Sequence, residues 1–232
     1  MTGAELLGKL SSLPLVYRPG AVWEYGFGLD VLGLVVELIS QEPLGQYLTD
    51  NVWRPLGMTD TGFGVPPEKI ARYATALPND PETGQPQPSR SLTHKFDCGG
   101  GCAMGTAGDY MRFAQMLLNK GKYGDTRILA RKTVEYMLSN QLGPEVKNLV
   151  GVADPTRADY GFGLGLAVQT TPGIVRMVGS VGNFSWPGAS GTNWWADPKE
   201  DMVVVFMAAS PGPIRWHYRE VIDAMVNRAI VD

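Results

Sequence analysis

The chain has 232 residues, of which 44% are hydrophobic and 19% charged, and its formal net charge is −3. This composition excludes a disordered chain and allows one large domain, or two small ones, with a substantial core. Acidic and basic residues are interspersed, which argues against nucleic acid or a membrane surface as partner. The longest apolar run, residues 31–39, is interrupted by Gly33 and Glu37. It is far shorter than the roughly 20 residues of a membrane span.

The first half of the chain predicts helices and a long polar loop. The sequence of residues 2–10 predicts the end of a helix, in a short segment. Residues 14–28 predict a loop that contains Pro, Gly and aromatic residues. Residues 29–54 predict two helices, the first with apolar side chains at helical spacing and the second starting near Pro43. Residues 60–102 are rich in Pro, Gly, Asn and Asp, so we expect a surface excursion with room for a short hairpin.

The second half predicts two helices, a set of strands and a closing helix. Within residues 105–121, Thr106 is expected to cap a helix that stops at Gly121. A further helix is expected within residues 130–142. Four strands separated by turns are expected at residues 160–169, 173–181, 191–197 and 202–210. An amphipathic helix is expected at residues 214–230.

This order of elements predicts an α+β fold. Helices come first, an antiparallel meander follows, and the last helix can cover the sheet. We expect one domain over residues 1–232, with mainly helix and loop in residues 1–145 and strands with a C-terminal helix in residues 146–232. No internal repeat is visible in the sequence.

The two cysteines, Cys98 and Cys102, lie four residues apart in a Gly-rich stretch. They could be half of a zinc site, but no second Cys or His pair follows at metal spacing, so we expect no metal and no other cofactor. We expect two free thiols, which favours a reducing, cytoplasmic compartment. The first 15 residues lack the basic start and long apolar stretch of a signal peptide. The only histidines, His94 and His217, are expected in surface or capping roles.

Common nucleophile and nucleotide motifs are absent from the sequence. There is no G-x-S-x-G elbow, which argues against an α/β-hydrolase, and no phosphate-binding loop or dinucleotide fingerprint. From the residues alone, Tyr25 is most simply a core tyrosine near a helix start. Pro187-Gly188 alone is an ordinary turn signal, and Trp186 can simply pack between sheet and helices.

Five spaced segments carry more information together than any of them does alone. They are "RPGAVWEYGFGLDVLGLVVELIS", "RPLGMTDTGF", "GGGCAMGTAGDYMRFAQMLLNKG", "YGFGLGLAV" and "FSWPGASGTNWWADPKEDMVVVFM". In order and spacing they closely resemble the serine β-lactamase-like family, and within it the class C-type esterases, also called family VIII carboxylesterases. The resemblance runs from about residue 13 to the C-terminus.

The resemblance implies a β-lactamase/transpeptidase-like fold and a site built from three motifs. The first is S-x-x-K, with the nucleophilic serine; the second holds a tyrosine that acts as general base; the third is K-T-G or, in the esterase-like branch, W-x-G. Tyr25 occupies the tyrosine position, Trp186 and Gly188 the W-x-G position, and Ala189 the position of an oxyanion-hole N–H. A phenol is a weak acid, so a tyrosine serves as a base only where cations stabilise its phenolate, which is the lysine's task. A backbone N–H at a strand edge is a rigid donor to the oxyanion.

Two departures from the family pattern concern the substrate. Trp186 stands where a lysine would pair with a substrate carboxylate, and Phe27 stands at a position that is Asn in many lactamases. Gly188, before the oxyanion donor, allows close approach of the substrate. We therefore expect Trp186, Gly188 and Phe27 to contact a neutral ester or amide.

No Ser or Thr in the 232 residues is followed three residues later by Lys. Only 24 residues precede Tyr25, whereas S-x-x-K lies well upstream of the tyrosine in family members. We therefore expect a fragment, one piece of a split protein or a natural truncation, lacking the N-terminal part of the fold. Such a chain alone would form no acyl-enzyme.

The sequence leaves three functions open. The first is a serine hydrolase, a carboxylesterase on short acyl esters; the second is a β-lactamase or D-amino-acid peptidase; the third is a non-catalytic binding or scaffold module with the same fold. Because the meander would lack partner strands, we also expect a homo-oligomer, or an N-terminal fragment pairing with the exposed sheet edge.

Overall fold

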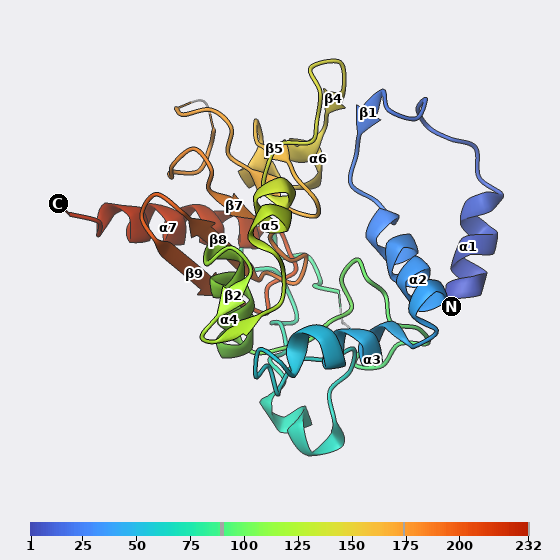
Figure 1. Ribbon diagram of the computed structural model, residues 1–232. Helices are drawn as coiled ribbons and strands as arrows, with labels where there is room; N and C mark the ends of the chain where they lie inside the picture. The colour runs from blue at the N-terminus through green and yellow to red at the C-terminus, as the bar shows by residue number, and fades with distance from the viewer. Residues whose placement is uncertain (89–90, 174, 232) are drawn as a thin grey trace.

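A five-stranded antiparallel sheet forms the centre of the molecule (Figure 1). We describe a computed structural model that covers residues 1–88, 91–173 and 175–231. Each strand pairs with the next along the chain, so the sheet is the expected meander. Its strands are β5 (Gly161–Phe162), β6 (Ala167–Val168), β7 (Phe184–Ser185), β8 (Asn193–Asp197) and β9 (Met202–Phe206).

Helices precede and follow the sheet, as the α+β prediction requires. The last helix lies beside the sheet in Figure 1, and the C-terminus extends from it at the opposite side of the view from α1. The helices are α1 (Gly3–Ser11), α2 (Gly28–Ser40), α3 (Leu44–Leu48), α4 (Ala107–Leu118), α5 (Arg131–Met137), α6 (Val150–Ala153) and α7 (Ile214–Arg228). A π-turn at Thr49–Trp53 extends α3, and 3₁₀ turns occur at Pro67–Arg72 and Pro155–Arg157.

Four strands of the sheet, β5 to β8, are buried, and β9 is half-buried. One core cluster joins α4 to the sheet and includes Leu117 and Trp194, and a second includes Tyr160 and Phe162. All five residues of β8 are buried, which explains why its sequence does not alternate between apolar and polar residues. The W-x-G segment therefore begins directly after a buried strand, β7.

Short strands tie the N-terminal part to the rest of the chain. β1 (Val22–Trp23) pairs in parallel with β4 (Lys147–Asn148), and Figure 1 shows the two side by side. The strand pair holds the segment that leads into Tyr25. Elsewhere, β2 (Lys122–Tyr123) and β3 (Thr126–Arg127) form a small hairpin after α4.

Several sequence predictions for the helices are confirmed. The Thr106 side chain accepts a hydrogen bond from the Asp109 N–H at the start of α4, and Gly121 has a φ of +93° just after its end. α3 starts directly after Pro43, as predicted. α5 is shorter than the predicted 130–142.

The long loop at residues 60–102 contains the expected turn. Asn79 and Pro86 form an isolated antiparallel bridge. Between them, the buried Asp80 accepts hydrogen bonds from backbone N–H groups of its own turn and from the Ile214 N–H at the start of α7. The loop is therefore fastened to the C-terminal helix rather than loose.

Two strand predictions are wrong. Residues 160–169 are not one strand but the hairpin β5–β6, because Gly165, with a φ of +86°, turns the chain. Residues 173 and 175–181 form no strand, and Ile174 lies outside the described residues. The third strand is β7 instead, which begins at Phe184 after a turn at residues 181–182.

Candidate active site

Trp186 lies directly after β7 and joins the two core clusters. Its ring makes edge contacts with Phe162 (centroids 5.2 Å apart) and Trp23 (6.3 Å). The ring of Tyr25 lies against it at 4.9 Å and is tilted by 41°. The structure thus brings together the tyrosine and the W-x-G position, which are 161 residues apart in the sequence.

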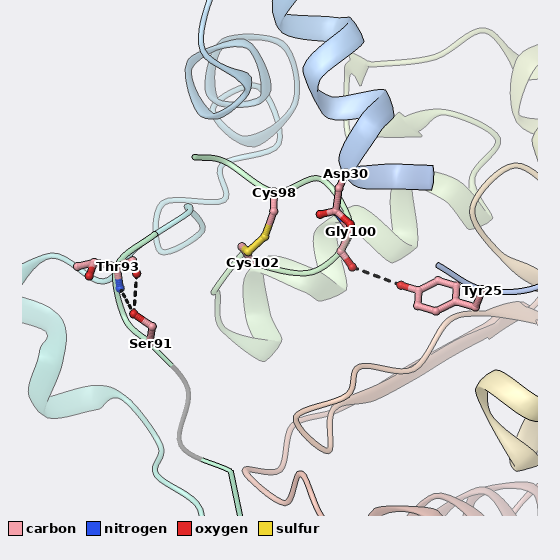
Figure 2. Close-up of a disulfide and its surroundings, with 7 residues drawn as sticks. All are labelled: Tyr25, Asp30, Ser91, Thr93, Cys98, Gly100 and Cys102. Carbon is pink, nitrogen blue, oxygen red and sulfur yellow. Dashed lines mark hydrogen bonds between the residues drawn. A yellow bond between two sulfur atoms is a disulfide. The ribbon is translucent and has the colours of Figure 1, made fainter. Parts of the chain in front are cut away.

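The Tyr25 side chain points toward the Gly-rich loop at residues 98–102 (Figure 2). Its hydroxyl donates to the Gly100 carbonyl at 3.3 Å, and 39% of the residue is exposed. The Gly100 N–H in turn donates to Asp30 in the first turn of α2, at 3.1 Å. Tyr25 is therefore not the core tyrosine that the residues alone suggest, but a partly exposed side chain whose hydroxyl bonds the Gly-rich loop.

Cys98 and Cys102 form a disulfide, so the prediction of two free thiols is wrong. The loop turns back on itself and brings the two Cα atoms to 5.4 Å, within the range that a disulfide spans. The argument for a reducing, cytoplasmic compartment loses its basis with this pairing.

Two of the three glycines of this loop, Gly99 and Gly100, pack closely against the start of α2. A Cβ on Gly99 would lie 2.4 Å from the Leu29 carbonyl oxygen, and one on Gly100 would lie 2.5 Å from an Asp30 carboxylate oxygen. Because the Gly99 contact is with backbone, only a residue without a side chain fits at that position, and the loop is packed against the start of α2.

Phe27 is the residue before α2, and 57% of it is exposed. It belongs to none of the aromatic pairs of the described residues. Its place two residues after Tyr25 puts it near the candidate site. Its expected contact with substrate remains a prediction.

A tight turn connects Trp186 to β8 and carries Ala189. The Gly188 N–H donates to the Thr192 carbonyl (2.9 Å), and the Gly191 N–H donates to the Gly188 carbonyl (3.1 Å). Ala189 is exposed, and its N–H has no acceptor among the residues that the structure describes. The predicted oxyanion donor is thus a free amide on a closed turn.

Two buried arginines beneath this turn have no counterpart in the sequence predictions. Arg219 of α7 pairs with the buried Asp154 and donates to the Gly188 and Thr192 carbonyls at 2.6 and 3.2 Å. Arg157 donates to the Ser185 hydroxyl and to the Asn193 side chain. Burial lowers the pKa of Arg219 to about 10, which still leaves it charged at neutral pH.

Asp223, one turn further along α7, is buried as well. Its carboxylate accepts a hydrogen bond from the Val178 N–H at 3.0 Å. Burial raises the pKa of Asp223 from 3.8 to about 6, against the opposing effect of the Arg157 charge.

We expect Asp223 to make the protein less stable as pH rises from about 4 to about 6. The folded state binds the proton of the Asp223 carboxyl more tightly than the unfolded state does. The stabilisation from this proton is therefore complete below the unfolded pKa of 3.8 and is lost as the pH rises through the folded pKa near 6. The shift corresponds to at most about 3 kcal/mol. Urea unfolding should show a smaller difference in stability between pH 4 and pH 7 for Asp223→Asn than for the wild type.

A control for this prediction is Asp159→Asn. Asp159 is exposed and has a positive φ that Asn also tolerates. The Asp159→Asn variant should show the same pH dependence of stability as the wild type. The same pH dependence in both variants and the wild type would contradict the assignment to Asp223.

Other kinds of site find little support in the described part of the chain. Within it, no group of three His, Cys, Asp or Glu side chains is arranged to hold a metal ion. None of the helices that the structure describes is long and apolar enough to cross a membrane. His94 and His217 are both exposed, in agreement with the prediction.

Comparison with known proteins identifies the family to which the chain belongs. A family model described as Beta-lactamase matches residues 1–221. The chain is 38% identical over 208 residues to Protein Rv1367c of Mycobacterium tuberculosis, a match that covers 87% of this chain and 52% of that protein. It is 29% identical over 245 residues to Esterase EstB of Burkholderia gladioli, covering 95% of this chain and 59% of that esterase. The chain therefore belongs to the beta-lactamase family.

Solved structures show the same fold. The structure of EstCE1, a hydrolase with promiscuous acyltransferase activity, matches with a TM-score of 0.78 and 26% identity, over 97% of this chain and 61% of that one. Simvastatin Synthase (LovD) from Aspergillus terreus matches with a TM-score of 0.76 and 25% identity, over 99% and 62%. The predicted β-lactamase/transpeptidase-like α+β fold is confirmed. The chain spans about half to three fifths of the length of these relatives.

Proposed function

We propose that this chain supplies the tyrosine and oxyanion side of a serine hydrolase site, and that the complete site is a carboxylesterase acting on short acyl esters. The observation that carries the proposal is the packing of Tyr25 on Trp186, which lies two residues before a closed turn whose Ala189 N–H is free. A tyrosine hydroxyl that can act as a base and a free backbone donor are two of the groups that acyl transfer requires.

In the complete site, a serine attacks the ester carbonyl and its proton passes through the Lys–Tyr25 pair. The Ala189 N–H and the N–H of the serine hold the oxyanion of the tetrahedral intermediate. The alcohol leaves with a proton, and water then attacks the acyl-enzyme and releases the acid. The 232 residues contain no Ser-x-x-Lys, so we assign the serine and its lysine to a segment outside these residues.

The choice of an ester over a β-lactam rests on Trp186. An aromatic ring occupies the place where, by the resemblance, a lysine would pair with a substrate carboxylate. The relatives named above include an esterase, a hydrolase with promiscuous acyltransferase activity and Simvastatin Synthase (LovD) from Aspergillus terreus. These relatives favour a mechanism in which the acyl group passes from the acyl-enzyme to water or to an alcohol.

We expect residues 1–232 alone to hydrolyse p-nitrophenyl butyrate no faster than a buffer blank, because these residues contain no S-x-x-K motif. A form that also carries the family's S-x-x-K segment should hydrolyse it and leave nitrocefin intact. Assays of the hydrolysis rates of both substrates test these expectations. Hydrolysis by residues 1–232 that a serine-directed phosphonate abolishes would refute the missing nucleophile, and nitrocefin turnover would favour a β-lactamase.

We also propose that a second chain or segment covers the outer edge of β9 and the apolar surface of α2. Among the described strands β9 pairs only with β8, and the exposed apolar residues of α2 are Leu32, Val35, Leu38 and Ile39. Unpaired edges and apolar patches recruit other chains. The non-catalytic scaffold remains the alternative function, and turnover by a longer form would exclude it.

Sedimentation velocity over a range of concentrations tests this proposed contact. We expect residues 1–232 to associate as the concentration rises. Leu38→Glu on the α2 surface should weaken the association, and Val152→Glu, an exposed apolar site on α6, serves as the control. A monomer at all concentrations would contradict self-association.

A further inference from the structure

Arg219 hydrogen-bonds the carbonyl of one particular peptide group, the one that joins Gly188 to Ala189. Its Nη2 lies 2.6 Å from the Gly188 oxygen. The N–H of that same peptide group is the Ala189 N–H. No described peptide bond is cis, and in a trans peptide the C=O and N–H point in opposite directions. The guanidinium therefore lies behind the amide, and the N–H points away from it.

We propose that Arg219 is a positioning and polarising residue for the Ala189 amide. The inference rests on the proposed role of that amide as oxyanion donor. A cation on the carbonyl draws electron density toward the oxygen, which leaves the N–H more positive and a stronger donor. Arg219 acts through the peptide group and does not itself touch the substrate.

Burial makes this effect strong. Arg219 is 1% exposed, and Asp154, its ion-pair partner, is 5% exposed, so little water screens the charge. The pair fixes the guanidinium in one place, since Nη1 binds Asp154 while Nη2 reaches the turn. The other end of the turn is held independently, because the Ser210 N–H donates to the Ser190 carbonyl at 2.8 Å. The residues on both sides of Ala189 are thus tethered while its own N–H stays free.

Arg157 and Arg215 show that this contact is specific to Arg219. Arg157 bonds the Ser185 and Asn193 side chains beneath the turn. Arg215 lies on the same helix as Arg219 and also donates to backbone carbonyls, but to those of Pro211 and Gly212. Of the described arginines, Arg219 is the one with a hydrogen bond to the Gly188–Ala189 peptide.

Amide hydrogen exchange of Ala189, followed by NMR on the full 232-residue chain, tests the proposal. Exchange of a free amide is base-catalysed and passes through an anion whose charge rests on the carbonyl oxygen. Arg219 stabilises that anion directly. Arg219→Met should therefore slow exchange at Ala189 by about tenfold, since the lost interaction is a hydrogen bond between charged groups.

A purely structural role predicts the opposite direction. Loosening of the turn would speed exchange of the Gly188 N–H, which is bonded to Thr192, and would not slow that of Ala189. If Arg219→Met does not fold, Asp154→Asn combined with Arg219→Met removes the lone buried carboxylate and should show the same slowing. Arg215→Met, the matched control, should leave Ala189 unchanged.

The proposal is overturned if exchange at Ala189 is unchanged or faster without Arg219, or if Arg215→Met slows it as much. Exchange needs neither serine nor substrate. A failure of the proposed hydrolase function would appear as absent turnover in a longer form and would leave the exchange result standing.

Discussion

Tyr25→Phe is expected to lower ester hydrolysis by about 10²- to 10⁴-fold in a form of the protein that carries the serine, the range typical of a lost general base. The ring would keep its contact with Trp186, and only the hydroxyl and its 3.3 Å hydrogen bond to Gly100 would be lost. The loss should fall on kcat, because the proton transfer belongs to the transition state. Steady-state kinetics with p-nitrophenyl butyrate measure it.

Stability separates this effect from damage to the fold. Loss of one hydrogen bond from a partly exposed hydroxyl costs about 1 kcal/mol or less, so Tyr25→Phe should unfold near the wild-type urea concentration. Tyr136→Phe changes another exposed tyrosine, on α5, and should leave turnover unchanged. Equal turnover in Tyr25→Phe and the wild type would remove Tyr25 from the mechanism.

The largest loss of stability is expected from Arg219→Met. It leaves the Asp154 carboxylate buried without its counter-charge and removes two hydrogen bonds to the turn. Breaking a buried ion pair from one side typically costs about 3–5 kcal/mol. Asp154→Asn with Arg219→Met should recover part of this loss, because the double variant leaves no unpaired charge. Urea unfolding, extrapolated linearly to water, gives the values.

An exposed ion pair provides the comparison. Arg54 pairs with Asp50, one turn earlier in the chain, and 69% of the Arg54 side chain is exposed. Arg54→Met should change stability by no more than about 1 kcal/mol. If Arg219→Met is equally mild, or if the double variant simply adds the two single losses, the buried pair does not act as a unit.

The sequence predicted the fold where local signals were strong. The α4 helix was predictable because Thr106 and Gly121 mark its ends and its apolar face has helical spacing. The short strands β5 and β6 were predicted as one strand, and β7 was missed, because two-residue strands carry no periodicity and their positions depend on packing. The division into residues 1–145 and 146–232 remains a prediction.

For the candidate site, the resemblance pointed to Tyr25, Trp186, Gly188 and Ala189, and the structure places Tyr25 against Trp186. It could not reveal Arg219, because an arginine in an amphipathic helix is usually solvent-exposed. The disulfide was missed for a different reason. The spacing of Cys98 and Cys102 permits a pair, but only the backbone turn that brings their Cα atoms together decides it.

The most direct test of a site shared between this chain and an S-x-x-K segment is the position of the nucleophile. A fluorophosphonate that reacts with activated serines, followed by peptide mass spectrometry, locates it in a form that carries both parts. We predict that the label lies on the serine of the S-x-x-K segment and on none of residues 1–232, and that Tyr25→Phe slows the labelling. A label on a serine within residues 1–232 would contradict the account.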